Sequence, residues 1–288
     1  MTTDTVDQAR VAAIQMVSGA DLETNLQTAA KLIERAAKDG AQLLVLPETF
    51  ALFLSSEQRE LGRREAGAAA RIRPFLGEIA ARYGIWIVGG TLPIVDADDP
   101  RPRAASIVFD DTGAEVARYD KLHLFDVDVS DKQGRYCESD TFRPGAIERV
   151  KIVPTPFGKL GLSVCYDLRF AELFQTLRDQ GAEIFAVPSA FTLHTGLAHW
   201  LPLLRARAIE TQSFMIGANQ GGEHSAKRQT SGGSVIISSW GEVLAEVKLG
   251  EAVVIATIDL AKMRQERAAM PVAQHRRFVV SSKSVPGE

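Results

Sequence analysis

The stretch Lys159-Leu-Gly-Leu-Ser-Val-Cys-Tyr-Asp-Leu-Arg-Phe170 decides the fold. Its apolar side chains alternate with small or polar ones up to Cys165, which is the period of a short β-strand. Apolar residues at helical spacing follow over 171–179, and residues 184–187 are typical of a second strand. The stretch therefore predicts a β-α-β unit, with Cys165 at the carboxyl end of the first strand. In open α/β sheets, ligands and catalytic groups collect at this edge.

The rest of the chain extends this pattern of buried strands and amphipathic helices. The expected strands are residues 11–16, 43–46, 85–88, 214–219 and 253–258, with hairpins over 106–118 and 235–247. The expected helices are residues 21–38, 57–83 with a break or restart near Pro74, 197–212 and 261–270. Residues 122–146 show little periodicity, and so long a loop in a compact domain is usually functional. No repeat or linker divides the chain, so we expect a single domain over residues 1–288 with a C-terminal tail from about residue 271.

Composition limits the classes of protein to consider. The chain has 288 residues, of which 45% are hydrophobic, and a net charge of −3, so it can bury a large core. This slight acidity argues against a nucleic-acid partner. No apolar run is long enough to cross a bilayer, and the first residues lack the pattern of a secretory signal. The two cysteines, Cys137 and Cys165, favour a reducing, cytoplasmic setting over a disulfide scaffold.

Three reactive side chains occupy equivalent positions, because Glu48, Lys121 and Cys165 each follow the end of an expected strand. A thiol nucleophile needs a base to remove its proton and a positive group to stabilise the attacked carbonyl oxygen. Glutamate and lysine can supply these two roles. Each residue also has an ordinary interpretation: a buried structural cysteine, a helix-capping glutamate and a surface lysine. The spacing alone leaves both interpretations open.

Three segments resemble the signatures of the nitrilase, or carbon–nitrogen hydrolase, superfamily in sequence and in order. They are Leu46-Pro-Glu48, Tyr119-Asp-Lys121-Leu-His-Leu and Gly161-Leu-Ser-Val-Cys165-Tyr-Asp-Leu-Arg169. The resemblance runs from about residue 11 to residue 277 and implies an α/β fold, a four-layer α-β-β-α sandwich. It further implies that Glu48 is the general base, Lys121 the electrophilic cation and Cys165 the nucleophile. Glu138 matches a second glutamate that the family places near the lysine and the substrate.

Within the superfamily, the chain is most similar to the branch of omega-amidases and deaminated-glutathione amidases. Pro188-Ser-Ala-Phe-Thr192 carries part of this likeness, and Lys227-Arg228 leans toward the second group. The resemblance implies a cofactor-independent hydrolase that cleaves a small linear carboxamide to a carboxylate and ammonia through a cysteine thioester. The expected substrate is an omega-amide such as deaminated glutathione or an α-ketoacid amide. Residues expected beside the substrate are Tyr166, whose backbone N–H would hold the oxyanion, and Ser189, Phe191 and Thr192.

Two further positions bear on the substrate. Arg169 lies four residues past Cys165, where a guanidinium offers a bidentate fork to a substrate carboxylate. An ion pair with Asp167 or Glu172 is the alternative for this arginine. The family often carries an aromatic residue and a histidine where this chain has Ser231 and Gly233, so we expect the pocket mouth to be reshaped there.

The resemblance also implies a homodimer, packed through the helices beside the nucleophile strand, with the C-terminal tail crossing to the partner. We expect the apolar side chains of Trp200, Leu203 and Leu204 to form a helix face larger than one sandwich needs to cover itself, in agreement with such a dimer.

Rival functions remain to be separated. Gly161-Leu-Ser163-Val-Cys165 approaches the G-x-S-x-G elbow of a serine esterase, but its fifth residue is not glycine. Hydrolysis of a nitrile or an N-carbamoyl amino acid would use the same triad as amide hydrolysis. His194 and His199 are five residues apart and would not share a helix face as metal ligands do, so we expect no metal and no other cofactor.

Overall fold

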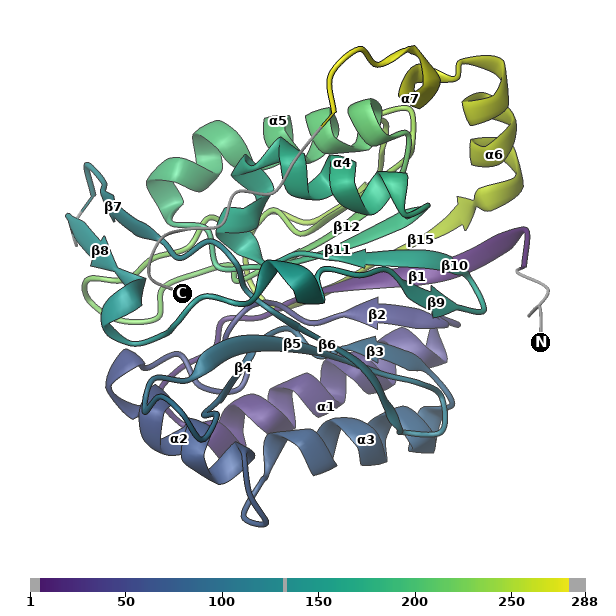
Figure 1. The fold of residues 1–288 in the computed structure, drawn as a ribbon. Helices are drawn as coiled ribbons and strands as arrows, with labels where there is room; N and C mark the ends of the chain where they lie inside the picture. The colour runs from purple at the N-terminus through teal and green to yellow at the C-terminus, as the bar shows by residue number, and fades with distance from the viewer. Residues whose placement is uncertain (1–5, 132–133, 280–288) are drawn as a thin grey trace.

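Two β-sheets pack face to face, and each is covered on its outer side by helices (Figure 1). The computed structural model describes residues 6–131 and 134–279. The predicted four-layer α-β-β-α sandwich is therefore confirmed.

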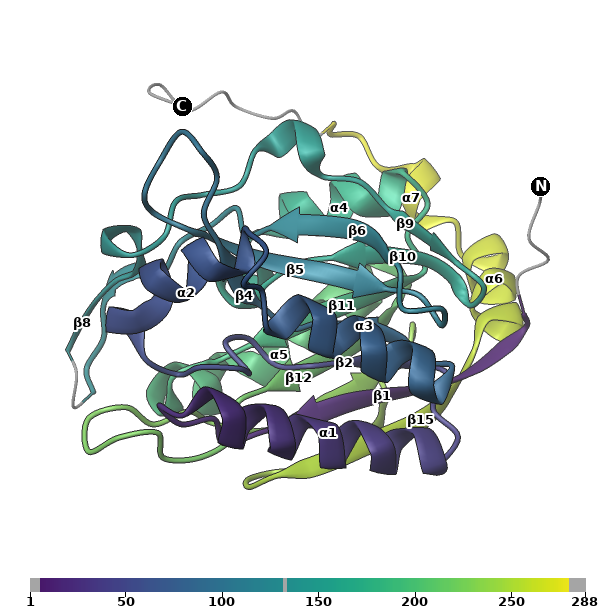
Figure 2. The same ribbon diagram turned by 90° about the horizontal axis from the view of Figure 1, so that it is seen from below.

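The first sheet combines the N-terminal strands with the last strand of the chain. Its order is β15 (Ala252–Asp259), β1 (Gln8–Gln15), β2 (Leu43–Val45), β3 (Trp86–Val88), β5 (Arg103–Phe109) and β4 (Leu92–Ile94), with β6 (Glu115–Asp120) also paired to β5. Strands β1, β2 and β3 are parallel, and the other pairings are antiparallel. The helices that cover its outer face are α1 (Leu22–Lys38), α2 (Gln58–Glu65) and α3 (Ile72–Tyr83) (Figure 2).

The second sheet contains the β-α-β unit predicted from residues 159–187. Its order is β14 (Val243–Glu246), β13 (Val235–Ile237), β12 (Phe214–Asn219), β11 (Ile184–Ser189), β10 (Gly158–Leu162) and β9 (Val153–Thr155), with β10, β11 and β12 parallel. Helices α4 (Ala171–Asp179) and α5 (Leu193–Thr211) cover its outer face. Outside both sheets lie the hairpin of β7 (Asp126–Asp128) and β8 (Arg135–Cys137), and the helices α6 (Leu260–Ala269) and α7 (Val272–His275).

Alternation along the strands divides the core into two parts. Val11 and Leu43 belong to the cluster that includes the side chains between the two sheets, whereas Ala12 and Leu44 belong to the cluster under α1 and α3. Successive side chains of a strand point to opposite faces, so a strand that is buried on both faces supplies both clusters. The near-continuous apolar runs of the sequence therefore mark the inner strands of a layered fold.

The helical region 57–83 is interrupted and restarts at Ile72, close to Pro74 as the sequence predicts. The chain leaves the helix over residues 66–71, before Pro74, and Pro74 is the third residue of α3. The buried carboxylate of Glu65 accepts hydrogen bonds from the N–H groups of Arg71 and Ile72 at 2.7 and 2.8 Å, which caps the new helix. Proline is tolerated in the first turn, where N–H groups have no partner within the helix. The restart therefore depends on a side-chain cap.

Helix α5 starts four residues earlier than the predicted 197, because the hydroxyl of Thr192 accepts from the N–H of Thr195 and caps it. The expectation of a surplus apolar face is wrong. Trp200 and Leu204 are buried in the core, and Leu203 packs against it. On the same helix, Leu197 is 75% exposed and Ile209 50% exposed, so any apolar contact surface lies there.

The homodimer stays a prediction. Of the tail said to cross to the partner, residues 280–288 lie outside the described residues. Across the described part of the chain, no helix combines the length and apolar character needed to span a membrane.

The loop that carries Glu48 depends on a glycine in the neighbouring connection. A Cβ at Gly90 would lie 2.1 Å from the carbonyl oxygen of Pro47, whereas a Cβ at Gly84 would meet nothing within 4 Å. The two glycines have almost equal φ angles, +58° and +59°. Gly84→Ala therefore isolates the cost of a left-handed backbone, and Gly90→Ala adds the clash.

We expect Gly84→Ala to lower the free energy of unfolding by about 1 kcal/mol, the cost of the left-handed conformation. Gly90→Ala should cost roughly 1–3 kcal/mol more, the usual range for an overpacked site. It should also lower kcat, because relief of the clash moves Pro47 and Glu48. Thermal denaturation and turnover of both variants test this. Equal loss of stability in the two, with normal turnover, would contradict it.

Candidate active site

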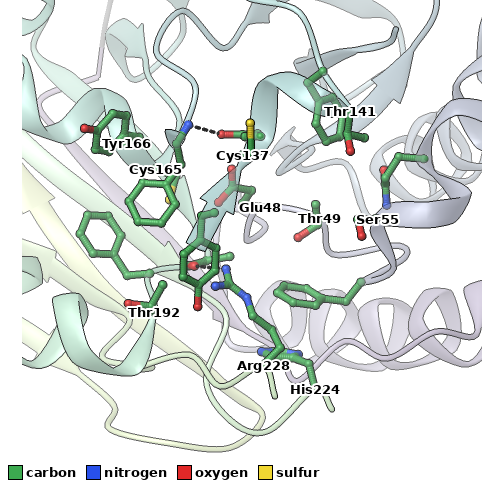
Figure 3. Close-up of a pocket in the computed structure, with 18 of the residues that line it drawn as sticks. Glu48, Thr49, Ser55, Cys137, Thr141, Cys165, Tyr166, Thr192, His224 and Arg228 are labelled. Carbon is green, nitrogen blue, oxygen red and sulfur yellow. Dashed lines mark hydrogen bonds between the residues drawn. The ribbon is translucent and has the colours of Figure 1, made fainter. Parts of the chain in front are cut away.

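Glu48, Lys121 and Cys165 meet at one edge of the sandwich. Glu48 follows β2 and Lys121 follows β6 in the first sheet, while Cys165 follows β10 in the second. The ammonium Nζ of Lys121 lies 2.9 Å from Oε1 of Glu48. Glu48 and Lys121 are also the charged groups that act most strongly on the Cys165 thiol. The structure thus brings together the three residues that the sequence singles out; Glu48 and Cys165 are labelled in Figure 3.

Glu138 completes the surroundings of the lysine. It comes from a short turn after β8, and its two carboxylate oxygens lie 2.8 and 2.7 Å from Nζ of Lys121. The backbone N–H of Phe125 donates to the same carboxylate at 2.7 Å. Lys121, only 2% exposed, is therefore held between two carboxylates, and the irregular region 122–146 supplies one of them.

The charges of this cluster act against one another. Burial opposes the charge on Lys121, but the carboxylates of Glu138 and Glu48 outweigh it and hold its pKa well above the ordinary value. Burial and the charge of Glu48 raise the pKa of the Cys165 thiol well above its ordinary value, although Lys121 and the N–H of Ala190 act in the other direction. Burial also raises the pKa of Glu138, against the effect of Lys121. The resting thiol is therefore neutral.

Cys165 stands on a strained turn. Its φ angle is +48°, in the left-handed region that costs a non-glycine residue of order 1–3 kcal/mol and that clusters at functional sites. Directly after it, residues 165–169 form a 3₁₀ turn that leads into α4. The turn lifts the cysteine out of β10 and presents its side chain to the pocket.

Asp167 fixes this turn relative to Lys121. Its fully buried carboxylate accepts four hydrogen bonds: from the Tyr119 hydroxyl at 2.7 Å, the Val164 N–H at 2.9 Å, and the N–H and ring Nδ1 of His123 at 3.1 and 2.7 Å. Tyr119 and His123 flank Lys121 in sequence, so one carboxylate connects the segment of Lys121 to the turn that carries Cys165. Sequence reasoning considered Asp167 only as a partner for Arg169 and missed this role.

A pocket of about 570 Å³ opens over the cluster of Glu48, Lys121, Glu138 and Cys165. Besides Glu48, Lys121 and Cys165, five predicted residues line it: Glu138, Tyr166, Arg169, Phe191 and Thr192. Ser189 does not; it is fully buried, and its hydroxyl donates to the Val187 carbonyl at 3.3 Å. Nor do Ser231 and Gly233 line the pocket: Ser231 accepts from the Asn219 amide, and the Gly233 carbonyl accepts from the Trp200 indole. The expected change at the pocket mouth therefore does not arise from direct contact.

Arg169 reaches the pocket wall. Its guanidinium lies 5.7 and 5.6 Å from the ring centroids of Tyr166 and Phe191, and Nη1 is 3.2 Å from Nδ1 of His199. Asp167 is occupied by the four hydrogen bonds above, and among the described residues Arg169 forms an ion pair with neither Asp167 nor Glu172. The alternative interpretation of Arg169, an ion pair with Asp167 or Glu172, therefore loses its support.

The serine-esterase alternative also loses its support. Ser163 is fully buried, and its hydroxyl donates to the Ala186 carbonyl at 3.1 Å, away from the pocket lining. Within residues 6–131 and 134–279, no group of three or more His, Cys, Asp or Glu side chains is placed to hold a metal ion.

Sequence reasoning did not place Arg228 and Tyr136 in the site. Both line the pocket, and the guanidinium of Arg228 lies 4.8 Å from the centroid of the Tyr136 ring. Arg228 belongs to the connection 221–233. The resemblance of Lys227-Arg228 to one branch of the superfamily was the only feature of the sequence that pointed to a role for it. Tyr136 lies in the region 122–146, where weak periodicity hid the hairpin of β7 and β8.

Comparisons with known proteins agree with this geometry. The profile of the carbon-nitrogen hydrolase family matches residues 10–268, and the chain belongs to this family. The predicted enzyme class, a hydrolase of carbon–nitrogen bonds other than peptide bonds, is thereby confirmed. A deaminated glutathione amidase of Yersinia enterocolitica is 42% identical over 274 residues, which cover 95% of this chain and 94% of the relative.

Solved structures show the same fold. The NitFhit protein of C. elegans has a TM-score of 0.85 at 38% identity; the match covers 95% of this chain but only 66% of that one. An amidase from Nesterenkonia sp. AN1, 26% identical with a TM-score of 0.75, matches over 91% of this chain and 98% of its own. That structure is of a mutant of the amidase, with glutamine in place of a glutamate, and it shows the result of Michael addition of acrylamide at the active-site cysteine.

The raised thiol pKa predicts an unusual response to substitution. In a Cys137→Ser background, iodoacetamide should alkylate Cys165 slowly at pH 7 and faster as the pH rises past 9. Glu48→Gln removes the negative charge that raises the thiol pKa, so alkylation at pH 8 should become faster while turnover falls. Lys121→Met should have the opposite effect on alkylation. Intact-mass kinetics measure both, and a thiol that titrates below pH 7 in the parent would contradict the assignment.

Proposed function

We propose that this carbon–nitrogen hydrolase is an amidase that cleaves a linear carboxamide through a thioester on Cys165. The observation that carries the proposal is the buried Lys121 ammonium, held by Glu48 and Glu138 beside a neutral thiol on a strained turn. The acrylamide adduct of the Nesterenkonia amidase supports a cysteine nucleophile.

The first half-reaction forms the thioester. Glu48 removes the proton of Cys165, and the sulfur attacks the amide carbon. Negative charge then develops on the carbonyl oxygen, where Lys121 and the backbone N–H of Tyr166 stabilise it. Glu48 returns the proton to the nitrogen, so the C–N bond breaks and ammonia leaves from a primary amide, or the corresponding amine from an N-substituted amide.

The second half-reaction releases the acid. Water replaces ammonia, Glu48 accepts a proton from it, and the resulting hydroxide attacks the thioester carbon. The tetrahedral oxygen is again held by Lys121. Collapse expels the Cys165 sulfur, which recovers its proton from Glu48, and the carboxylic acid is released and loses its proton to the solvent. Glu138 keeps the Lys121 ammonium in place throughout by accepting its hydrogen bonds.

The substrate we propose is an omega-amide that bears a carboxylate remote from the scissile bond, such as deaminated glutathione or an α-ketoacid amide. The names of the relatives support this choice, as does Arg169, whose guanidinium lines the pocket. We further propose that residues 1–288 act as one catalytic domain, since both sheets supply the triad. A reducing, cytoplasmic setting and a homodimer complete the proposal; Cys137 and Cys165 are both free thiols, as such a setting requires.

Substitution of the triad tests the chemistry. Glu48→Gln and Lys121→Met should each lower kcat by on the order of 10²–10⁴, the usual scale for loss of a general base or an oxyanion-stabilising group. Cys165→Ala should abolish turnover with the fold intact. Product release is measured over a panel of omega-amides, nitriles and N-carbamoyl amino acids, with mass analysis for an acyl adduct on Cys165. Activity that survives Cys165→Ala but is lost in Ser163→Ala would reject the assignment.

Replacement of Arg169 tests the carboxylate. Arg169→Lys should raise KM for carboxylate-bearing amides, with a smaller effect on kcat, because lysine cannot offer the bidentate fork. A uniform effect on all amides together with a lower Tm would instead indicate a structural role. Equal turnover of a neutral aliphatic amide and its carboxylate analogue by the parent enzyme would refute the carboxylate itself.

A further inference from the structure

The peptide group between Glu48 and Thr49 is held at both ends by side chains. Its carbonyl oxygen accepts a hydrogen bond from Nε2 of Gln220 at 3.1 Å. Its N–H, which belongs to Thr49, donates to the hydroxyl oxygen of Thr91 at 2.8 Å. Gln220 is fully buried and Thr91 is 2% exposed, so water competes little for either bond. The orientation of the peptide plane directly after the Glu48 side chain is therefore fixed.

Thr49 has a strained backbone conformation. Its φ angle is +52°, in the left-handed region that a β-branched residue rarely adopts and that costs of order 1–3 kcal/mol. Among the described residues other than glycine, only Thr49, Cys165 and Gln212 have a positive φ angle. Thr49 and Cys165 both line the pocket (Figure 3), whereas Gln212 ends α5. Such strain persists only where the surroundings enforce it, and the hydrogen bonds of Gln220 and Thr91 do so here.

Gln220 connects the two sheets. It follows β12 in the second sheet, which also carries Cys165, whereas Ser18 follows β1 in the first sheet. Oε1 of Gln220 accepts from the Ser18 N–H at 3.1 Å, and Nε2 donates to the Ser18 hydroxyl at 2.9 Å. That hydroxyl in turn donates to the Phe50 carbonyl at 2.7 Å. Exchange of the amide oxygen and nitrogen would place donor against donor at the Ser18 N–H, so the network determines the orientation of the amide.

The Glu48 carboxylate has to serve two groups at once. It lies 2.9 Å from Nζ of Lys121, and it must also reach the Cys165 thiol to remove its proton. Rotation of the peptide after Glu48 would move this carboxylate, and a displacement of about 1 Å at a reacting group can cost on the order of 100-fold in rate. Neither Gln220 nor Thr91 lines the pocket, so neither side chain contacts a bound substrate.

We propose that Gln220 and Thr91 are positioning residues for the general base. They hold the peptide between Glu48 and Thr49 in its strained conformation and thereby orient the Glu48 carboxylate toward Cys165. This inference rests on the proposed function, to which it adds that proton transfer depends on two buried side chains outside the triad. One comes from each sheet, since Thr91 lies between β3 and β4 of the first sheet.

Thr91→Val tests the inference, because valine keeps the shape of threonine and removes the acceptor. It should lower kcat roughly 10- to 100-fold and leave KM for the same amide nearly unchanged. Thr91→Ser, which restores the hydroxyl, should recover most of this loss. In a Cys137→Ser background, Thr91→Val should also make alkylation of Cys165 by iodoacetamide at pH 8 faster, because a displaced Glu48 raises the thiol pKa less. The gain should be about threefold for a tenfold rise in the thiolate fraction. Gln220→Met should change both quantities in the same direction.

Thr155→Val is the matched control. The Thr155 hydroxyl accepts from the Phe157 N–H at 3.1 Å in an equally buried position, and Thr155 pairs with the start of β10, at the end away from Cys165. This variant should lower Tm as Thr91→Val does, with parental kcat and alkylation. The same result in Thr91→Val, loss of Tm alone, would overturn the inference even if Gln220→Met fails to fold. Failure of the parent to hydrolyse any amide would reject the proposed function, whereas the alkylation rates would still report where Glu48 lies.

Discussion

The structure depends on one buried ammonium. Lys121 is 2% exposed, and its charge is tolerated only because Glu48 and Glu138 surround it at hydrogen-bond distance. Removing one partner from such a group leaves an uncompensated buried charge, which is strongly destabilising. The two carboxylates arrive by different routes, one from the end of β2 and one from the turn after β8. The first sheet and the region 122–146 must therefore both be in place before the lysine can be buried.

The composition of this cluster governs the proposed chemistry. With both carboxylates ionised, Glu48, Glu138 and Lys121 carry one net negative charge, and this excess disfavours a second negative charge on Cys165. Proton transfer from the thiol to Glu48 moves the negative charge without adding one. Attack then moves it again, to the carbonyl oxygen. In the proposed reaction, one charge passes between three positions around a fixed ammonium, so the buried site never holds more charge than it does at rest.

The sequence predicts those parts of the fold and site that follow from local patterns. The ends of the strands that lead to Glu48, Lys121 and Cys165 can be located from periodicity, and the motifs identify their chemistry. Other parts depend on contacts between distant segments. Asp167 connects the turn that carries Cys165 to Tyr119 and His123. These partners lie more than 40 residues away in sequence, so the residues around Asp167 do not predict them. On α5, apolar residues occur on more than one side, so periodicity could not tell that Trp200 is buried and Leu197 exposed.

The distribution of charge separates reaction from recognition. In the catalytic cluster, each ionised side chain has an opposite charge within hydrogen-bond distance, and Asp167 holds its geometry. On the pocket walls, the guanidinium groups of Arg169 and Arg228 lie against aromatic rings without a carboxylate partner among the described residues. Substitution of a residue in the cluster is costly, because it leaves an oppositely charged buried partner unpaired. Arg169 and Arg228 on the pocket walls have no carboxylate partner among the described residues, so their substitution leaves no buried carboxylate unpaired. Substrate preference on this fold can therefore change through the walls while the reaction stays the same.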